Sequence, residues 1–429
     1  MRSDITILRA DRLVDVDAGA VSSPAVIVVE GERIAAINPR ELPSNATEVD
    51  LGDVTLLPGL MDMELNMLLG GPSGGNPRSD VQDDPAFRTL RGTLNCRTTL
   101  LAGFTTARNL GLFVKTGGYL LDVALARAID NGWIDGPRLV PAGHAITPTG
   151  GHLDPTMFQR LGPDIMPLSV EEGIANGVPE VRKAVRYQLK YGARVIKISA
   201  SGGVMSHSGL AGAQQYSDEE LAAIVDEAHR AGIKVAAHAH GDAGIRACIR
   251  AGVDCIEHGS LASDDTIQMM VEHGTFLVPT SYLSEGLDVS RAAPELQAKA
   301  AEVFPKARAM LGKAIAAGVK IACGTDAPAI PHGENAKELW AMVDRGMKPM
   351  QALQAATIMS AELIGVDDRG RLAPGLLADI IAVPGDPSED ITTTQDVRFV
   401  MKGGRIYKGD DSAASGGERS VESTQRKLP

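Results

Sequence analysis

Residues 217–241 read SDEELAAIVDEAHRAGIKVAAHAHG, and they contain a helix followed directly by a strand. Ser217 is expected to cap the helix, because Glu220 three residues later completes a capping box. Apolar residues then recur at helical spacing, at Leu221, Ile224, Val225 and Ala228. Gly232 ends the helix, and the apolar residues 234–240 follow as a strand. The stretch is one helix–strand unit of an α/β fold.

The same alternation continues along the chain in both directions. The candidate strands are Thr55–Asn66, Gly103–Asn109, Arg138–Ile146, Ala193–Ala200, Ile233–His240, Val253–His258, Thr275–Pro279 and Val319–Asp326. Eight strands with helical segments between them are typical of a parallel barrel. We therefore predict an α/β chain with a (β/α)8 TIM barrel over residues 59–370.

The two ends of the chain differ from its middle in their predicted secondary structure. Short β-rich segments occupy residues 1–58, and similar segments return in residues 371–409. One small β-sandwich domain assembled from both termini is the economical explanation. Residues 410–429 contain few apolar side chains, and we expect a disordered tail there.

Composition and net charge argue against several classes of partner. The 429 residues carry a formal net charge of −12 without a basic stripe, which disfavours nucleic acid and membranes. No leader segment and no apolar run of membrane-spanning length is visible. The four cysteines lack zinc-ribbon spacing, so we expect reduced, buried thiols. These features predict a cytoplasmic protein whose partners are a small-molecule substrate and further copies of the chain, a homo-oligomer.

Polar residues at the ends of the predicted strands are the candidates for chemistry, because barrel active sites form at the carboxyl edge. Strand alternation directs Lys197 into the barrel and its neighbours Ile196 and Ile198 outward. A lysine there is costly unless it is paired, neutral or chemically changed. The simpler structural interpretations of Lys197 are an exposed lysine at the edge of the sheet and a buried ion pair.

Two histidines end neighbouring predicted strands. His238 and His258 can converge on one ion, because adjacent strands lie about 5 Å apart. Asp326 ends the eighth strand and could be a metal ligand, a general base or both, although Pro328 also allows a turn or helix-cap aspartate. Together with Lys197 these side chains suit zinc or a similar cation.

Several motifs carry a family resemblance. They are LPGLMDM at residues 57–63, TPTGGH at 147–152, the Lys197 strand followed by SGGV at 201–204, GLLAD at 375–379, and Gly403-Gly404. Together they resemble the metal-dependent amidohydrolase superfamily over the whole chain except the tail. The imidazolonepropionase-like and Xaa-Pro dipeptidase-like branch is the most similar.

The resemblance implies a set of roles. His238 and His258 would be metal ligands, and Lys197 would be a ligand after carbamylation by carbon dioxide. Asp326 would shuttle the proton, and His152 would contact the substrate or steady an oxyanion. Substrate contacts are further expected from Asn66, His207 and His240.

The chain departs from the family at the first barrel strand. Glu64-Leu65-Asn66 replaces the His-x-His that normally holds a second metal. Asparagine is a weak zinc ligand, so we expect one divalent ion, with zinc the first candidate. Glu64 could bind that ion, accept a proton as a catalytic residue, or pair with a cationic substrate.

These observations predict hydrolysis of a carbon–nitrogen bond by a metal-activated water. The substrate would be an N-acyl amino acid, a dipeptide-like compound, an aryl amide, or a urea or carbamate. Two glycine-rich loops, Leu68–Pro85 and Ser201–Tyr216, are expected to select it. The alternatives are a ring deaminase on the same barrel and a non-catalytic pseudoenzyme that lost its second metal site.

Overall fold

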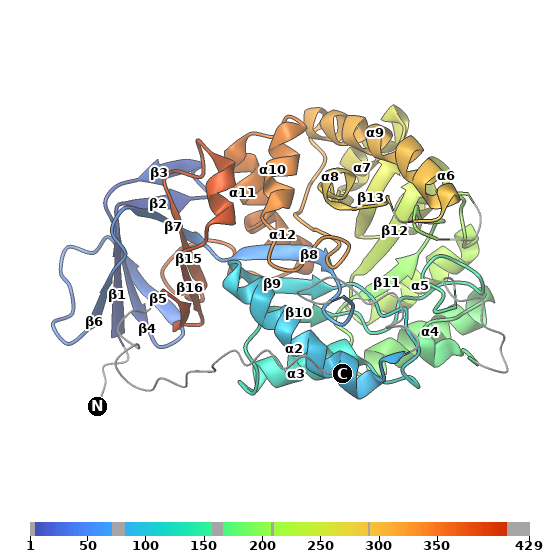
Figure 1. The fold of residues 1–429 in the computed structure, drawn as a ribbon, viewed down its shortest axis with the longest axis horizontal. Helices are drawn as coiled ribbons and strands as arrows, with labels where there is room; N and C mark the ends of the chain where they lie inside the picture. The colour runs from blue at the N-terminus through green and yellow to red at the C-terminus, as the bar shows by residue number, and fades with distance from the viewer. Residues whose placement is uncertain (1–4, 71–81, 157–165, 207–209, 291, 410–429) are drawn as a thin grey trace, which may run out of the picture.

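The computed structural model of the chain describes residues 5–70, 82–156, 166–206, 210–290 and 292–409. Figure 1 shows parallel strands in the middle of the larger lobe, helices around them, and a smaller lobe of β-strands at one side. The tail predicted at residues 410–429 and the candidate His207 lie outside the described residues.

The smaller lobe is built from both ends of the chain. Its two sheets share a buried core that includes Leu8, Ile27, Leu56 and Phe399. Strand β7 (Val54–Pro58) pairs with β15 (Ile380–Pro384), which joins the two ends of the chain. In strand order, one sheet is β5 (Arg33–Ile37), β4 (Ala25–Glu30), β1 (Ile5–Ala10) and β6 (Thr47–Asp50), and the other is β17 (Arg405–Lys408), β16 (Phe399–Lys402), β15, β7, β2 (Arg12–Asp15) and β3 (Ala20–Ser22).

Two parallel sheets form the middle of the larger lobe. In strand order, they are β10 (Arg138–Pro141), β9 (Phe104–Asn109) and β8 (Leu60–Leu65), and β11 (Ile196–Ser199), β12 (Val235–Gly241), β13 (Cys255–Leu261) and β14 (Phe276–Val278). All pairs are parallel and follow chain order, as alternation with helices requires. Their carboxyl ends therefore share one edge.

Backbone hydrogen bonds join these two sheets at both sides. Between β10 and β11, Ile146 donates to the Lys197 carbonyl at 2.8 Å, and Ser199 donates to the Ile146 carbonyl at 3.0 Å. On the other side, Ala322 donates to the Leu277 carbonyl at 3.0 Å, and Met63 donates to the Cys323 carbonyl at 2.8 Å. The segment around residues 320–327 thus lies between β14 and β8.

Three predicted strands differ from the structure. The strand predicted as Arg138–Ile146 ends at Pro141 as β10, and only isolated bridges follow at His144 and Ile146. The stretch predicted as Thr55–Asn66 is two strands, because Gly59 separates β7 of the smaller lobe from β8. A side chain at Gly59 would lie 2.1 Å from the Thr105 hydroxyl, so this crossing requires glycine. The segment predicted as Val319–Asp326 makes only isolated bridges. Thr325 and Asp326 both donate to the Glu64 carbonyl, which interrupts a regular ladder.

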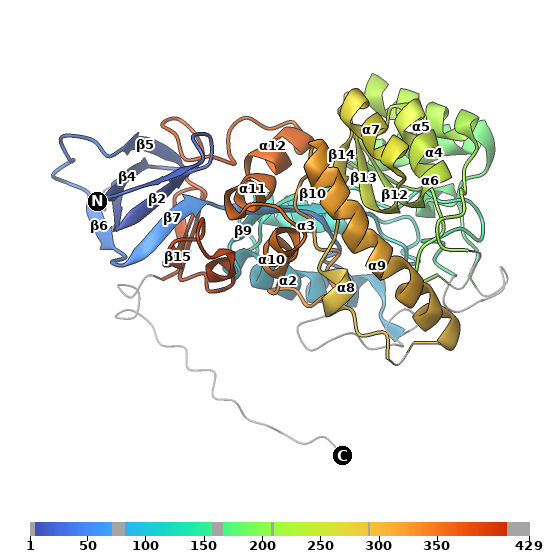
Figure 2. The same ribbon diagram turned by 90° about the horizontal axis from the view of Figure 1, so that it is seen from above.

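The helices lie outside the parallel strands, as Figure 2 also shows. The predicted capping box is present, with Ser217 and Glu220 bonded to each other's backbone at the start of α5. All four cysteines are free and buried, as expected. Within the described part of the chain, no helix has the length and apolar character needed to cross a membrane. The longer helices are α2 (Pro85–Leu101), α3 (Leu121–Asp130), α4 (Gly177–Lys190), α5 (Asp218–Arg230), α6 (Asp242–Ala251), α7 (Asp264–His273), α9 (Pro294–Ala317) and α10 (Lys337–Asp344), and the shorter ones are α8 (Leu283–Gly286), α11 (Pro349–Ala355) and α12 (Ile358–Ile364).

Candidate active site

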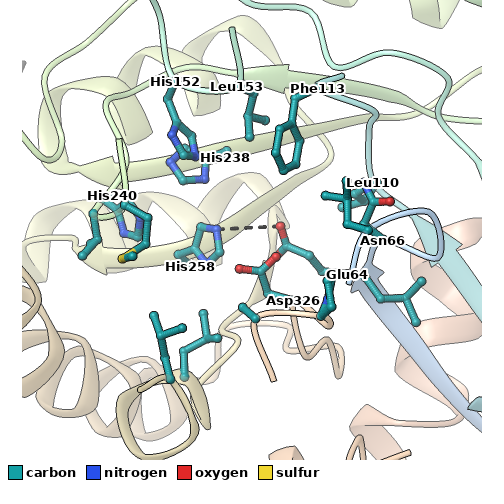
Figure 3. A pocket seen from close by; sticks show the side chains of 18 of the residues that line it. Glu64, Asn66, Leu110, Phe113, His152, Leu153, His238, His240, His258 and Asp326 are labelled. Carbon is teal, nitrogen blue, oxygen red and sulfur yellow. Dashed lines mark ion pairs between the residues drawn. The ribbon is translucent and has the colours of Figure 1, made fainter. Parts of the chain in front are cut away.

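One cavity of about 230 Å³ at the carboxyl edge of the parallel strands gathers the predicted site residues. Those that line it are Glu64, Asn66, His152, Lys197, His238, His240, His258 and Asp326. Figure 3 shows the imidazoles on one side and the Glu64 and Asp326 carboxylates facing them. Chemistry-bearing residues that are distant in the chain are therefore neighbours in space.

Three histidines converge in this cavity. Strand β12 carries His238 and His240, and β13 carries His258. The ring centroids of each pair are 4.7 Å apart. One potential ligand atom from each ring lies within 4.8 Å of the other two. The structure thus adds His240, predicted only as a substrate-binding residue, to the two predicted metal-binding histidines.

Irregular backbone occurs between Ala239 and Gly241, at His258 and at Asp326. The pairing of β12 and β13 shifts register between Ala239 and Gly241, and such bulges re-aim side chains next to active sites. His258 has φ 70° and Asp326 has φ 58°, in the left-handed region that residues other than glycine rarely adopt. Strain of this kind persists only where the surroundings hold it, and it concentrates at functional sites.

Hydroxyl groups fix two of the imidazole rings. Ser260 lies 2.9 Å from His240 Nδ1, and Thr280 Oγ1 lies 2.7 Å from His258 Nδ1. The Thr280 hydroxyl donates its proton to the Pro279 carbonyl at 2.8 Å, so it accepts from His258 Nδ1–H. A neutral His258 therefore presents an unprotonated Nε2 to the cavity. Sequence reasoning missed Ser260 and Thr280; their positions just after strand ends were the available signal.

Burial sets the charge of the imidazoles. Desolvation lowers the pKa of His238, His240 and His258 well below the usual value, and their mutual repulsion acts in the same direction for His238 and His240. Burial also lowers the pKa of His152 to about 3. The rings are neutral at physiological pH, the state in which imidazole binds metal.

Glu64 and Lys197 form a buried ion pair. Lys197 Nζ lies 2.9 Å from Glu64 Oε1, and both side chains are at most 5% exposed. The same Glu64 oxygen lies 3.7 Å from His258 Nε2, the contact dashed in Figure 3. Lys197, predicted as a metal ligand, pairs with Glu64 in the structure, and its role as a ligand stays a prediction.

Asp326 lies beside this pair. Desolvation raises the pKa of Asp326 well above the usual carboxyl range, and repulsion from Glu64 adds to the shift. Its position is held by Asp62, which accepts from the Thr325 backbone at 3.1 Å and from the Thr325 hydroxyl at 2.6 Å. A carboxyl group with a raised pKa at the edge of a cavity can carry a proton between reacting atoms.

The remaining predicted site residues are Asn66 and His152, and they differ in their contacts. The Asn66 amide donates to the Gly111 carbonyl at 2.8 Å, and its oxygen accepts from the Leu68 backbone at 3.0 Å, so both groups organise the loop after β8. The His152 ring lies 4.1 Å from the His238 ring. It packs on Gly203, where a side chain would come within 2.4 Å of the ring.

A second buried ion pair was not predicted from the sequence. Arg108 donates to Glu257 at 2.9 Å and to the Met63 carbonyl at 2.6 Å. Both side chains are at most 2% exposed, and each comes from the interior of a parallel strand. A charged residue within an otherwise apolar strand was the available signal.

Much of the cavity lining is apolar. This part is formed by Leu69, Leu110, Phe113, Leu153, Val204, Met205, Leu283, Leu287, Phe304 and Pro328. The described parts of the two loops expected to select the substrate contribute Leu69, Val204 and Met205. The cavity therefore combines polar groups with apolar walls that can bind an apolar group of a ligand.

The donor set fits a divalent transition metal. Three neutral imidazoles and adjacent carboxylates are the ligands that zinc prefers. Among the described residues, His238 Nε2 and Glu64 Oε2 are buried and have no hydrogen-bond partner. Buried polar atoms without partners are rare in folded proteins, and a bound cation would satisfy both.

Known proteins resemble the chain over nearly its whole length. The amidohydrolase family matches residues 55–407. Ochratoxinase from Aspergillus niger is 35% identical, with 94% of this chain and 87% of that protein aligned. A Xaa-Pro dipeptidase crystallised with methionine in its active site has a TM-score of 0.87 at 37% identity, covering 94% of this chain and 100% of that one. A prolidase bound to N-methylphosphonate-L-proline has a TM-score of 0.85 at 33% identity, covering 94% and 99%. The chain therefore belongs to the amidohydrolase family and is a hydrolase acting on carbon–nitrogen bonds.

Proposed function

We propose that the chain hydrolyses the amide bond of an N-acyl amino acid or dipeptide-like compound that carries an apolar group. The observation that carries this proposal is the cluster of His238, His240 and His258 facing Asp326 within an apolar-walled cavity. The relatives named for Xaa-Pro dipeptides and ochratoxin support an amide substrate, and the methionine held by one of them supports an apolar side chain. Aryl amides, ureas and carbamates are the alternative substrate classes.

The proposed metal site contains His238 and His258, with His240 and the two carboxylates within reach. One divalent ion, zinc by preference for these donors, would supply Lewis acidity toward the carbonyl oxygen and acidify a neighbouring water. Every other step belongs to side chains of the chain itself.

Asp326 is proposed as the group that moves protons. Its carboxylate accepts the proton of the attacking water and returns it to the departing nitrogen, which cannot leave as an amide anion. His152 is proposed to donate to the oxyanion that develops on the carbonyl. Its Nδ1 is buried and has no partner among the described residues, so this atom is available for the contact.

The fold itself is proposed to be a closed (β/α)8 barrel of residues 59–370. Seven parallel strands and the segment near residues 320–327 are linked in a ring by the hydrogen bonds described above, which supports closure. Residues 1–58 and 371–409 would form the β-sandwich domain, whose two sheets share one core. A cytoplasmic location stays a prediction.

Self-association is proposed to use helix α2. Phe87, Leu90 and Leu94 recur on one face of this helix and are 54%, 67% and 56% exposed. An antiparallel copy that places Phe87 opposite Leu94 also places the exposed Asp84 opposite the exposed Arg97. This apolar and charge complementarity of the face with itself favours a second copy of the chain as the partner.

The proposed activity can be tested with a substrate panel. N-acyl amino acids, Xaa-Pro dipeptides, anilides and phenylureas are incubated with enzyme, with enzyme plus chelator, and with chelated enzyme resupplied with zinc. We expect release of an amino acid from substrates with apolar groups, its loss with chelator, and its return with zinc. Ammonia release from a ring amine would favour the deaminase alternative, and activity unchanged by chelator would contradict the metal.

A further inference from the structure

The short helix α8 forms one apolar part of the cavity lining. Leu283 and Leu287 lie one helical turn apart, and both line the cavity. The helix has only four residues, and a helix of this length has little stability of its own. Contacts from other parts of the chain must therefore hold the two leucines in place.

One such contact comes from Glu338 on α10. Its Oε1 accepts from the Ser281 backbone N–H and its Oε2 accepts from the Tyr282 N–H, each at 2.7 Å. Glu338 is fully buried, and a buried carboxyl group is costly unless it is hydrogen-bonded. The two N–H groups therefore satisfy Glu338, and Glu338 in return fixes the turn that leads into α8.

The backbone at this turn is strained. Thr280 has φ 47°, in the left-handed region that residues other than glycine rarely adopt. Such a conformation persists only where the surroundings hold it. The hydrogen bonds to Glu338 begin at the very next residue, Ser281, so Glu338 is placed to hold the chain in this conformation.

A second anchor of α8 also comes from α10. Arg345, which follows the last residue of α10, donates to the two Glu285 oxygens at 2.6 and 2.7 Å and to the Ser284 hydroxyl at 2.9 Å. Glu338 and Arg345 are about two helical turns apart and therefore lie on the same face. Within the described residues, α10 contributes nothing to the cavity lining, yet it holds the element that carries Leu283.

We propose that Glu338 is a positioning residue that gives the chain its selectivity for apolar substrates. It acts through the backbone of the turn before Leu283 and does not touch the substrate. This proposal rests on the proposed function and deepens it, because it names what sets the position of the apolar wall. Loss of the anchor weakens binding of the apolar group and leaves the reacting groups of the cavity in place.

The first test compares two substrates that differ only in their side chain, N-acetyl-leucine and N-acetylglycine. Glu338→Gln keeps the size of the side chain but places an amide donor against one of the two backbone N–H groups. We expect KM for N-acetyl-leucine to rise about tenfold, while kcat for both substrates and KM for N-acetylglycine stay within about threefold. The control is Glu334→Gln, from the surface pair of Glu334 with Lys337, which should change none of these values.

The second test is a double-mutant cycle with Leu283. If Glu338 acts through Leu283, the double variant Glu338→Gln with Leu283→Ala should have the KM of Leu283→Ala alone. A general loss of stability would instead multiply the effects of the two single changes. Multiplied effects would therefore overturn the proposal.

Hydrogen exchange tests the anchor without turnover. Amides of residues 281–287 should exchange at least about tenfold faster in Glu338→Gln, whereas β12 and β13 keep their protection. Glu285→Gln loosens the same segment at a partly exposed position, so it should give a smaller change in the same direction even where Glu338→Gln fails to fold.

The outcomes separate this proposal from the proposed function. Unchanged exchange, or faster exchange with unchanged KM for N-acetyl-leucine, overturns the role of Glu338 and leaves the amidase function intact. Wild-type protein that does not hydrolyse N-acetyl-leucine overturns the apolar selection. Wild-type protein that hydrolyses no amide of the substrate panel overturns the proposed function as well.

Discussion

The two sides of the cavity offer opposite chemistry. The side formed by β12 and β13 presents neutral imidazoles fixed by hydroxyl groups, at His240 by Ser260 and at His258 by Thr280. The side formed by β8 presents Glu64 bonded to Lys197 and Asn66 bonded to backbone. The histidine side has the imidazoles that the family resemblance implies as metal ligands. The strand-one side has a carboxylate in an ion pair and an amide where the resemblance implies two further histidines.

The two sides therefore differ in the donors that they offer a cation. A histidine pair on strand one would add neutral donors, but Glu64 and Asn66 add one anion and one structural amide. Asn66 ties the end of β8 to Gly111 by a hydrogen bond. The comparison predicts that changes on the two sides have effects of different kind and size.

The largest effect is expected at Asp326, which lies between the two sides. Asp326→Asn keeps the shape of the side chain but removes the proton acceptor, so kcat/KM should fall by about 10²–10⁴. Metal content should stay within twofold of the wild type, because the histidines remain. The exposed Asp265→Asn is the control, and a fall of less than about tenfold in Asp326→Asn would remove Asp326 from proton transfer.

The second prediction compares the hydroxyls that hold His258 and His240. Thr280→Val removes the acceptor at His258 Nδ1 with little change in volume, and metal affinity should fall about 10–100-fold. Ser260→Ala, which affects His240 in the same way, should change affinity by less than about threefold. Metal titration with a competing chelator measures both. The reverse order would make His240 the ligand in place of His258.

The third prediction concerns the apolar wall, which both sides share. Leu283→Ala removes apolar surface from the cavity and should raise KM for an apolar amide about tenfold with kcat little changed. Steady-state kinetics with an apolar and a small polar substrate separate binding from chemistry. An equal effect on both substrates would show that the wall does not select them.

The smallest effect on catalysis is expected at α2, the helix that contacts the loop after β8. This helix supports the loop after β8, because Asn95 donates to the Met67 carbonyl at 2.8 Å. Leu90→Asp places a charge in the exposed stripe and should convert the oligomer to a monomer in light scattering, with kcat/KM within about threefold. Leu42→Asp, at an exposed leucine outside α2, should leave the assembly unchanged. An unchanged assembly in Leu90→Asp, or a monomeric wild type, would exclude α2 as the interface.

The sequence predicted those parts of the structure that depend on local spacing. Helix α5 and its capping box follow from residues within one turn of each other, and His238 and His258 follow from strand ends. The division at Gly59 did not follow, because an extended run does not show which sheet it joins. The steric reason is Thr105, a residue on another strand.

Contacts between distant strands were also beyond sequence reasoning. Glu64 and Lys197 are 133 positions apart, and Arg108 and Glu257 are 149 apart. Alternation directs each of these side chains away from the helices but does not specify which charge faces which. The inclusion of His240 among the converging imidazoles likewise depends on the register shift between β12 and β13.

The most direct test of the central claim is the metal content of purified protein. Elemental analysis of wild type and His238→Ala, both prepared without chelator and checked for folding, gives the ratio of divalent metal to chain. We predict one divalent ion per chain in the wild type and almost none in His238→Ala. Equal metal content in the two proteins, or none in the wild type, would contradict the account.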